Sequence, residues 1–255
     1  MTILCITGMH RSGTSLTAAW LEQCGLAIAD GAVIGPYFGN PKGHFEDEEF
    51  VNLHDSQIKT AYPRSDGWKV YDDVKKNLFT GKHLEIAREL AARRNSKFET
   101  WGWKDPRTVL FLESWLELLP DLKFLFVWRP AVEVVVSLVA RSRLDRQKRS
   151  FLQIDRVHST RLWRTYNRRI VDFIRGHPQN TLLLPVQSII NKDSQVIGLL
   201  NSKFGARFFH KRIKDYYEDG LLQKRPTEIT STLMCKRFQT HKLESELHNL
   251  SSLVT

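Results

Sequence analysis

Residues 1–17 read MTILCITGMHRSGTSLT, and this stretch decides the fold. Ile3 to Thr7 form an apolar run rich in β-branched side chains, which predicts a buried strand, and Gly8 ends it. From Ser15 to Leu21 the apolar residues resume at helical spacing. The order of strand, glycine-bearing loop and helix is typical of a repeating α/β architecture.

The loop between this strand and helix reads Gly8-Met9-His10-Arg11-Ser12-Gly13-Thr14-Ser15. Its glycines have the spacing of the Walker A loop G-x-x-x-x-G-K-[ST], but Thr14 stands at the lysine position. Backbone N–H groups and a helix N-terminus bind an anion without that lysine, which normally reaches the β/γ-phosphates of a nucleoside triphosphate. Arg11 supplies a positive charge instead, so the loop predicts a nucleotide with one 5′-phosphate that carries a transferable group.

Length and composition indicate an ordinary globular protein. With 255 residues the chain suffices for one substantial α/β domain, so we expect one domain over residues 1–255, with 229–255 as a candidate peripheral segment. Hydrophobic content of 42% and charged content of 26% exclude a disordered or fibrous class. No segment offers the ~20 apolar residues of a membrane span, and residues 1–17 lack a signal-peptide pattern. We therefore expect a cytoplasmic protein without a membrane span.

Charge and cysteine content leave the partner open. The net charge of +10 and the pI near 9.6 permit nucleic acid, an anionic glycan or an acidic peptide, and nothing in the sequence favours specific nucleic-acid binding. Cys5, Cys24 and Cys235 have no metal-ligand or redox spacing. For Cys5 and Cys24 we expect roles as small apolar core residues, and we expect no metal requirement.

The rest of the chain alternates between strand and helix patterns. Strands are expected at 100–104, 123–128 and 181–184, and helices near 50–58, 84–95, 109–119, 130–139, 151–175 and 188–204. The run 123–128 is almost continuously apolar, as in strands buried between two helix layers. The pattern predicts a three-layer α/β/α fold with a central parallel sheet, similar to P-loop NTPases.

Two charged stretches are interpreted as solvated surface. Asp47, Glu48 and Glu49 stand in the first turn of an expected helix, where acidic side chains favour the helix dipole. The expected helix 151–175 carries five arginines on its polar faces, and such charge runs usually face water. The alternative is a polyanion site formed by Arg156, Arg161, Arg164, Arg168 and Arg169.

A second candidate site begins more than a hundred residues after the loop. Arg129 closes the buried strand 123–128, and Ser137 follows eight positions later on the next expected helix. A guanidinium at a strand end can bind a phosphate bidentately, and a hydroxyl two turns along can add a hydrogen bond. The alternative is structural: Arg129 pairs with Asp105 or Glu133, and Ser137 packs against a neighbouring helix.

The two sites together resemble the donor-binding motifs of the sulfotransferase family, and the resemblance covers roughly residues 1–143. It implies that the donor is 3′-phosphoadenosine 5′-phosphosulfate and the product 3′-phosphoadenosine 5′-phosphate. The 5′-phosphate would be held by Gly8, Arg11, Ser12, Gly13, Thr14 and Ser15, and the 3′-phosphate by Arg129 and Ser137. Arg11 matches the family's cationic loop residue, often lysine, and would stabilise charge on the leaving oxygen.

The general base has two candidates. Residues 40–46, Asn-Pro-Lys-Gly-His-Phe-Glu, resemble a segment of bacterial sulfotransferases in which a carboxylate serves as base, which nominates Glu46. His44 is the rival, because a histidine has this role in the cytosolic steroid and phenol enzymes and its free pKa suits proton transfer. The structural alternative is that both residues fix a loop and cap a helix. Lys104-Asp105-Pro106-Arg107 is a further charged cluster, which either contacts a ligand or forms internal ion pairs.

The resemblance weakens toward the C-terminus. The glycine-rich basic segment that completes the 3′-phosphate site of cytosolic animal enzymes has no clear counterpart, and Arg207, Lys211-Arg212 or Lys224-Arg225 are candidate substitutes. The chain therefore stands nearer to the bacterial or glycan-type enzymes. The acceptor is expected to be a small molecule, glycan or peptide with a hydroxyl or amine, and the oligomeric state is not predicted. The alternatives are a P-loop small-molecule kinase and a non-catalytic nucleotide- or polyanion-binding module.

Overall fold

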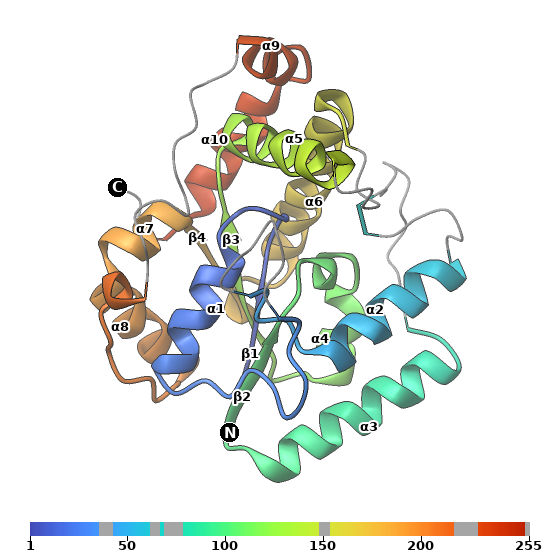
Figure 1. The fold of residues 1–255 in the computed structure, drawn as a ribbon. Helices are drawn as coiled ribbons and strands as arrows, with labels where there is room; N and C mark the ends of the chain where they lie inside the picture. Colours follow the sequence, from blue (N-terminus) through green and yellow to red (C-terminus); the bar gives the residue numbers. More distant parts are fainter. Residues whose placement is uncertain (36–42, 62–66, 69–78, 148–153, 217–228, 253–255) are drawn as a thin grey trace.

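The computed structural model describes residues 1–35, 43–61, 67–68, 79–147, 154–216 and 229–252. Its centre is a parallel sheet of four strands: β1 (Thr2–Thr7), β2 (Thr100–Lys104), β3 (Lys123–Trp128) and β4 (Thr181–Pro185). The strand order is β2-β1-β3-β4, and every pairing is parallel (Figure 1). The four expected strands and the central parallel sheet are thus confirmed.

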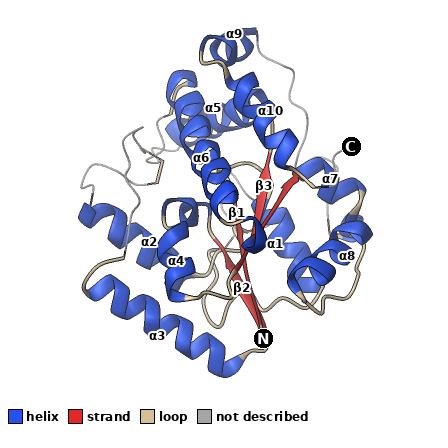
Figure 2. Cartoon of the chain, turned by 180° about the vertical axis from the view of Figure 1, so that it is seen from behind, coloured by secondary structure: helices blue, strands red, loops and turns tan. Residues whose placement is uncertain are grey.

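The sheet is covered by helices on both faces because its strands are apolar on both faces. Leu4 and Ile6 of β1 pack with helices α1 (Thr14–Gln23), α7 (Val186–Asn191) and α8 (Asp193–Phe204). Ile3 and Cys5 point to the other face and join a larger core. That core includes residues of α2 (Glu48–Ala61), α3 (Lys82–Lys97), α4 (Leu112–Leu118), α5 (Ala131–Gln147), α6 (Arg156–Gly176), α9 (Ile229–Arg237) and α10 (Thr240–Leu250). Figure 2 shows the strands enclosed between these groups, which confirms the three-layer α/β/α expectation.

Three expected helices differ from the structure in where they begin or break, and the one expected over 188–204 is divided at Lys192 into α7 and α8. The helix expected over 109–119 is broken in two: Pro106–Leu110 form a short 3-10 turn, η1, and α4 begins only at Leu112. The turn is tight because the Asp105 carboxylate accepts the backbone N–H of Arg107 at 2.9 Å. The helix expected over 151–175 begins at Arg156, and residues 151–153 lie outside the described part of the chain. Two further 3-10 turns, η2 (Pro178–Asn180) and η3 (Ile213–Asp215), complete the assigned elements.

Asp47 is the clearest correction to the solvated-turn interpretation. Glu48 and Glu49 are exposed, as expected, but Asp47 is buried and its carboxylate contacts the Arg94 guanidinium at 2.5 Å. Arg94 of α3 is buried too. Burial raises the pKa of Asp47 to about 6. The pair fastens the segment before α2 onto α3.

The solvated-surface interpretation of the α6 arginines holds for Arg161, Arg164 and Arg168, which are exposed, whereas Arg169 is half-buried. Arg168 and Arg175 form ion pairs with Glu246 of α10, each with a closest distance of 2.7 Å. Arg169 donates to the Val109 carbonyl at 2.9 Å. Arg168 and Arg175 thus link α10 to α6 from exposed positions, and Arg169 binds the backbone of η1. The helix α10 was not expected from the sequence, yet its Leu247 is fully buried. That one domain spans the chain stays a prediction.

Both outer strands of the sheet carry short segments that are not strands. Beside β2, Ala27 N donates to Thr100 O at 3.3 Å, and Gly102 N donates to Ala27 O at 2.9 Å. Beside β4, Ser252 N donates to Leu183 O at 3.0 Å. In the part of the chain that the structure describes, no helix is long and apolar enough to cross a membrane.

Candidate active site

The loop between β1 and α1 lies directly against the ends of neighbouring elements. Gly8 and Gly13 have positive φ values of 153° and 96°, and a Cβ on either would overlap Val127 or Val186. Arg11 also lies in the left-handed region, with φ of 68°. Alternating left-handed and right-handed residues turn successive N–H groups toward one side, which is the geometry of an anion-binding nest. Both glycines are therefore needed for the loop's path.

The hydroxyl side chains of this loop are mostly enclosed. Ser12 is fully buried, and its Oγ has no hydrogen-bond partner among the described residues. Thr14 is also buried, whereas Ser15 is half-buried. An unsatisfied buried hydroxyl costs about 1–3 kcal/mol, so it is uncommon unless an absent ligand or water completes it. Ser12 is consequently the best-defined candidate contact for a phosphate in the loop.

The loop and the second sequence motif meet in the structure. Arg11 Nε donates to Ser137 Oγ at 3.0 Å, across 126 positions of sequence. Arg129 is buried at the end of β3, and its Nε donates to Glu133 at 2.6 Å. The indole N–H of Trp163 donates to the Arg129 carbonyl at 3.0 Å and fixes the backbone there. The Glu133 partner given as the structural alternative is thus present, and Ser137 lies within hydrogen-bond distance of the loop.

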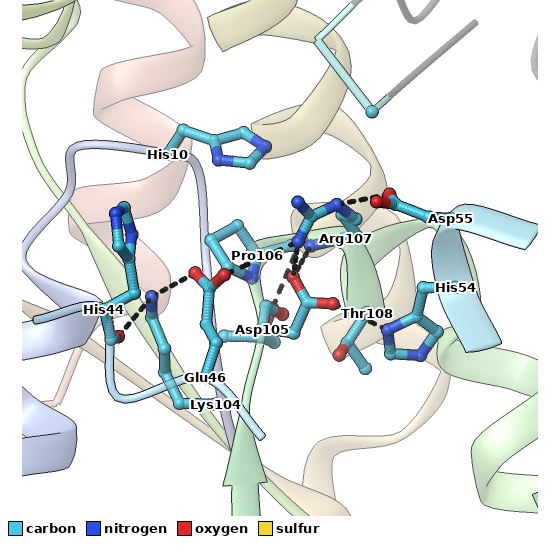
Figure 3. A network of polar contacts seen from close by, with 12 residues as sticks. His10, His44, Glu46, His54, Asp55, Lys104, Asp105, Pro106, Arg107 and Thr108 are labelled. Carbon is cyan, nitrogen blue, oxygen red and sulfur yellow. Dashed lines mark hydrogen bonds and ion pairs between the residues drawn. The ribbon is translucent and has the colours of Figure 1, made fainter. Parts of the chain in front are cut away.

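Glu46 is buried and lies among charged side chains (Figure 3). Its backbone carbonyl accepts Ile34 N at 2.9 Å, so the chain enters α2 as part of a short antiparallel pairing. One carboxylate oxygen contacts Lys104 Nζ at 2.5 Å, and the other lies 3.6 Å from Arg107 Nη1. Lys104 also donates to the His44 carbonyl at 3.1 Å. The Lys104–Arg107 cluster therefore orients the candidate base.

Arg107 is shared among three carboxylates. Besides Glu46, its guanidinium contacts Asp105 at 2.9 Å and Asp55 of α2 at 2.7 Å. Burial alone would raise the pKa of Asp105, but Arg107 and the hydrogen bond from His54 outweigh it and hold that pKa well below its usual range. Thr7 Oγ1 donates to the Asp105 carbonyl at 2.8 Å, which joins this network to the end of β1. The expected internal ion pair of Asp105 is confirmed, and Arg107 is its partner.

His44 is the second candidate base and is half-buried beside Glu46. Burial and the cations Lys104, Arg141 and Arg11 lower the pKa of His44 to about 4, against the opposing effect of Glu46. At neutral pH the ring is uncharged, and one ring nitrogen carries a lone pair. Its position near both Arg11 and Glu46 keeps it a candidate proton acceptor.

This lowered pKa predicts a loss of stability in acid. Between pH 6.5 and about 4 the unfolded chain protonates His44 while the folded chain does not, so the free energy of unfolding falls as pH falls. We expect His44→Gln to make the fall of Tm over this range shallower, as measured by thermal unfolding at steps of pH. His241→Gln, at an exposed position of α10, serves as the control. Equal slopes in wild type and H44Q would contradict the placement of His44.

His10 is a site residue that the sequence analysis missed. Its ring is buried, stacks on Trp68 with centroids 3.7 Å apart, and lies over the turn that carries Arg107 (Figure 3). Burial, followed by the charges of Arg107 and Lys104, lowers its pKa well below the usual value. A histidine between the two loop glycines was visible in the sequence, but only the fold brings Trp68 and Arg107 to it.

The C-terminal basic candidates do not reach this site in the described structure. Arg207 lines a polar cavity of about 550 Å³ with Thr2 and Thr100, at the opposite ends of the strands from the loop. Lys211 and Arg212 are exposed, and Arg212 pairs with Asp215. Lys224-Arg225 lie outside the described residues, as do residues 40–42 of the segment before His44. Among the described residues, no group of three His, Cys, Asp or Glu side chains is arranged to hold a metal ion.

Comparison with known proteins identifies the fold and the family. Residues 4–186 match the model of the family described as "Sulfotransferase family". The sulfotransferase from Alicyclobacillus acidocaldarius is similar with a TM-score of 0.58 and 14% identity, covering 98% of this chain and 95% of that one. A sulfotransferase domain from the curacin biosynthetic pathway has a TM-score of 0.54 and 13% identity, covering 93% and 97%.

A search of curated proteins found no match. The family model spans well over half of the chain, including the loop 8–15, the Lys104–Arg107 cluster, Arg129 and Ser137. The overall fold is similar to that of the solved Alicyclobacillus acidocaldarius sulfotransferase. The chain is therefore a transferase that moves sulfuryl groups, and it belongs to the sulfotransferase family.

Proposed function

We propose that this enzyme transfers a sulfuryl group from 3′-phosphoadenosine 5′-phosphosulfate to a hydroxyl or amine of an acceptor. The observation that carries the proposal is the hydrogen bond of 3.0 Å between Arg11 and Ser137. It joins the loop suited to a 5′-phosphate with the helix that follows Arg129. One nucleotide with a 5′-phosphate and a 3′-phosphate can bind to both motifs. A nucleoside 5′-triphosphate would instead bind at a loop that lacks the Walker lysine.

The residues of the loop fit a bound phosphate. Ser12 Oγ is buried without a partner among the described residues, so a phosphate oxygen would satisfy it. The backbone at Gly8 and Gly13 leaves no room for a Cβ, and the N-terminus of α1 begins at Thr14 with its N–H groups unpaired within the helix. Arg11 adds a fixed charge. Gly8, Ser12, Gly13, Thr14 and Ser15 would hold the 5′-phosphate, and Arg129 with Ser137 the 3′-phosphate.

When bound, the donor supplies the sulfuryl group and a phosphate leaving group. In the transfer, the bond from sulfur to the 5′-phosphate oxygen breaks, a bond from sulfur to the acceptor oxygen or nitrogen forms, and the acceptor proton passes to a base. Arg11 stabilises the negative charge that develops on the leaving oxygen, as a fixed cation whose proton stays in place. Glu46 takes the acceptor proton, and Lys104 and Arg107 hold its carboxylate in place.

His44 is the alternative base, and one observation favours it. Its ring is neutral at pH 7, because its pKa is about 4, whereas the Glu46 carboxylate is held by two cations. Against His44 stands the same low pKa, which makes it a weak base. Glu46 has the additional support of its buried, oriented position, so we keep it as the primary candidate.

The acceptor is proposed only as a small molecule, glycan or peptide that carries a hydroxyl or amine. We further propose a cytoplasmic location and one domain over residues 1–255, with no specific binding of nucleic acid and no metal requirement. The three cysteines are buried and free, as is usual in a reducing compartment. The packing of α10 on α6 supports a single domain.

The donor assignment predicts a selective thermal shift. At about 100 times its Kd, 3′-phosphoadenosine 5′-phosphate should raise Tm by about 5–10 °C without Mg²⁺, and ATP should do little. In Arg129→Ala, the preference for this nucleotide over its 3′-dephospho analogue should disappear. Arg161→Ala, on α6, is the matched control and should keep the preference. The reverse ranking of nucleotides would favour a P-loop kinase, and stabilisation by any polyanion alike would favour a non-catalytic binding module.

A further inference from the structure

A chain of buried hydrogen bonds leads from α4 to the charged cluster. The indole N–H of Trp115 lies 2.8 Å from His54 Nε2, and His54 Nδ1 lies 2.7 Å from Asp105. All three side chains are fully buried. Asp105 in turn contacts Arg107 at 2.9 Å, and Arg107 faces Glu46 (Figure 3).

These contacts determine where the proton of His54 sits. An indole N–H can only donate, so His54 Nε2 must accept from Trp115 and cannot carry a proton. The proton of the neutral ring is therefore on Nδ1, which donates to Asp105. Protonation of Nε2 would break the Trp115 hydrogen bond and place two donors against each other. His54 is thus held in its neutral form.

When His54 is neutral, the cluster around Asp105 carries a net negative charge. Glu46, Asp55 and Asp105 are three carboxylates, and in the described structure Lys104 and Arg107 are the cations in contact with them. The carboxylates therefore exceed these cations by one charge, which an imidazolium at His54 would cancel. Burial raises the pKa of Asp55, against the opposing effect of Arg107.

Other charged or titratable groups face this cluster from each neighbouring element. His10 of the loop and Tyr166 of α6 interact with Arg107, and His44 interacts with Glu46 and Lys104. His10 and His44 both have lowered pKa values and are neutral at pH 7. Lys59 of α2 faces Asp55 but is exposed, so water screens its charge. Of these described groups, none brings a buried positive charge to the cluster.

We propose that His54 is a positioning residue for the transfer, because its enforced neutrality preserves the negative charge that lets Glu46 accept a proton. The inference rests on the proposed function, with Glu46 as base. Asp105 keeps its full charge and engages the Arg107 guanidinium, so Arg107 binds Glu46 only at 3.6 Å. If His54 carried a proton, Asp105 would release part of its hold on Arg107. Arg107 would then bind Glu46 more tightly and make it a weaker base.

Trp115→Phe tests the proposal through the pH dependence of the reaction. Without the indole donor, His54 Nε2 is free to take a proton, so we expect activity about fourfold lower than wild type at pH 6 and equal to wild type at pH 8.5. Release of 3′-phosphoadenosine 5′-phosphate from the donor, with water as acceptor, measures the activity. Trp101→Phe is the control, because its buried indole donates to the amide oxygen of Asn95 and to no titratable group. It should keep the wild-type pH profile.

A double variant separates charge from packing. His54→Asn keeps a donor toward Asp105 but cannot ionise. Trp115→Phe in the H54N background should therefore show the wild-type dependence of activity on pH between pH 6 and pH 8.5. A loss at pH 6 that persists in the double variant would overturn the proposal, because packing would then explain it. Wild-type activity of W115F at pH 6 would overturn the proposal as well.

Nitrogen-15 NMR of the histidines gives a test that needs no activity. At pH 6, the nitrogen-15 shift of His54 Nε2 should be that of an unprotonated nitrogen in the wild type, whereas W115F should show the shift of a protonated one. Titration of His54 in the wild type would overturn the inference even if the nucleotide binds. Absence of 3′-phosphoadenosine 5′-phosphate binding in the wild type would instead contradict the proposed function.

Discussion

Replacing Glu46 by glutamine is expected to slow the transfer by about 10²- to 10⁴-fold, the usual contribution of a general base. The amide has nearly the same shape but cannot take the acceptor proton. Binding of 3′-phosphoadenosine 5′-phosphate should be unchanged, because the donor contacts are assigned to the loop and to Arg129 with Ser137. Turnover of an acceptor, found by mass spectrometric screening for addition of one sulfuryl group, and the nucleotide's Kd are the two measurements.

Glu48→Gln is the matched control, since Glu48 is an exposed carboxylate two residues away and should leave turnover unchanged. The variant Glu46→Gln also leaves Lys104 without its buried partner, so Tm must be measured to separate unfolding from a chemical defect. Near-normal turnover in E46Q would move the base to His44. In that case His44→Gln should show the large loss instead.

Gly102→Ala should strongly destabilise the fold, although it adds only one methyl group. A Cβ at Gly102 would overlap the carbonyl of Leu4 on the adjacent strand, and backbone there cannot move without breaking the β1–β2 pairing. We expect a loss of about 3–5 kcal/mol in the free energy of unfolding, measured by urea denaturation. The physical cause is overlap with a neighbouring backbone, since β2 itself has ordinary strand geometry.

Gly198→Ala is the control for this substitution, and we expect it to change the free energy of unfolding in the opposite direction. Gly198 lies on the exposed face of α8, and its Cβ would meet nothing within 4 Å. Alanine there should stabilise the chain by about 0.5–1 kcal/mol through its helix propensity. A cost for G102A below about 1 kcal/mol would mean that β1 and β2 are not packed as described.

The parts of the fold that depend on local pattern could be predicted from the sequence. The strand ending at Thr7 and the helix starting at Thr14 are set by apolar periodicity and by the glycines between them. Arg129 and Ser137 could be nominated because strand, arginine and hydroxyl occur within one short segment. The contact of Ser137 with Arg11 could only be inferred through the family resemblance, because no local rule links positions 126 residues apart.

The parts that depend on tertiary burial were not predictable. Asp47 and Arg94 each had a reasonable surface role in isolation, and only the packing of α2 on α3 makes them a buried pair. His54 and Trp115 carry no motif, since histidine and tryptophan on amphipathic helices are usual core residues. Their significance appears only when the turn at Asp105 places a carboxylate against them.

The segments beside the two outer strands bear on how the chain behaves at high concentration. A bare edge strand offers a row of unpaired N–H and C=O groups to any neighbouring molecule, and self-association through such edges leads to aggregates. Ala27 shields β2, and Ser252 shields β4 while Ser251 accepts from the Trp128 indole at 2.8 Å. A few residues of irregular chain thus cover the edge strands and hinder self-association. Variants that lack these residues would expose the edges and aggregate more readily, although every residue of the candidate active site is still present.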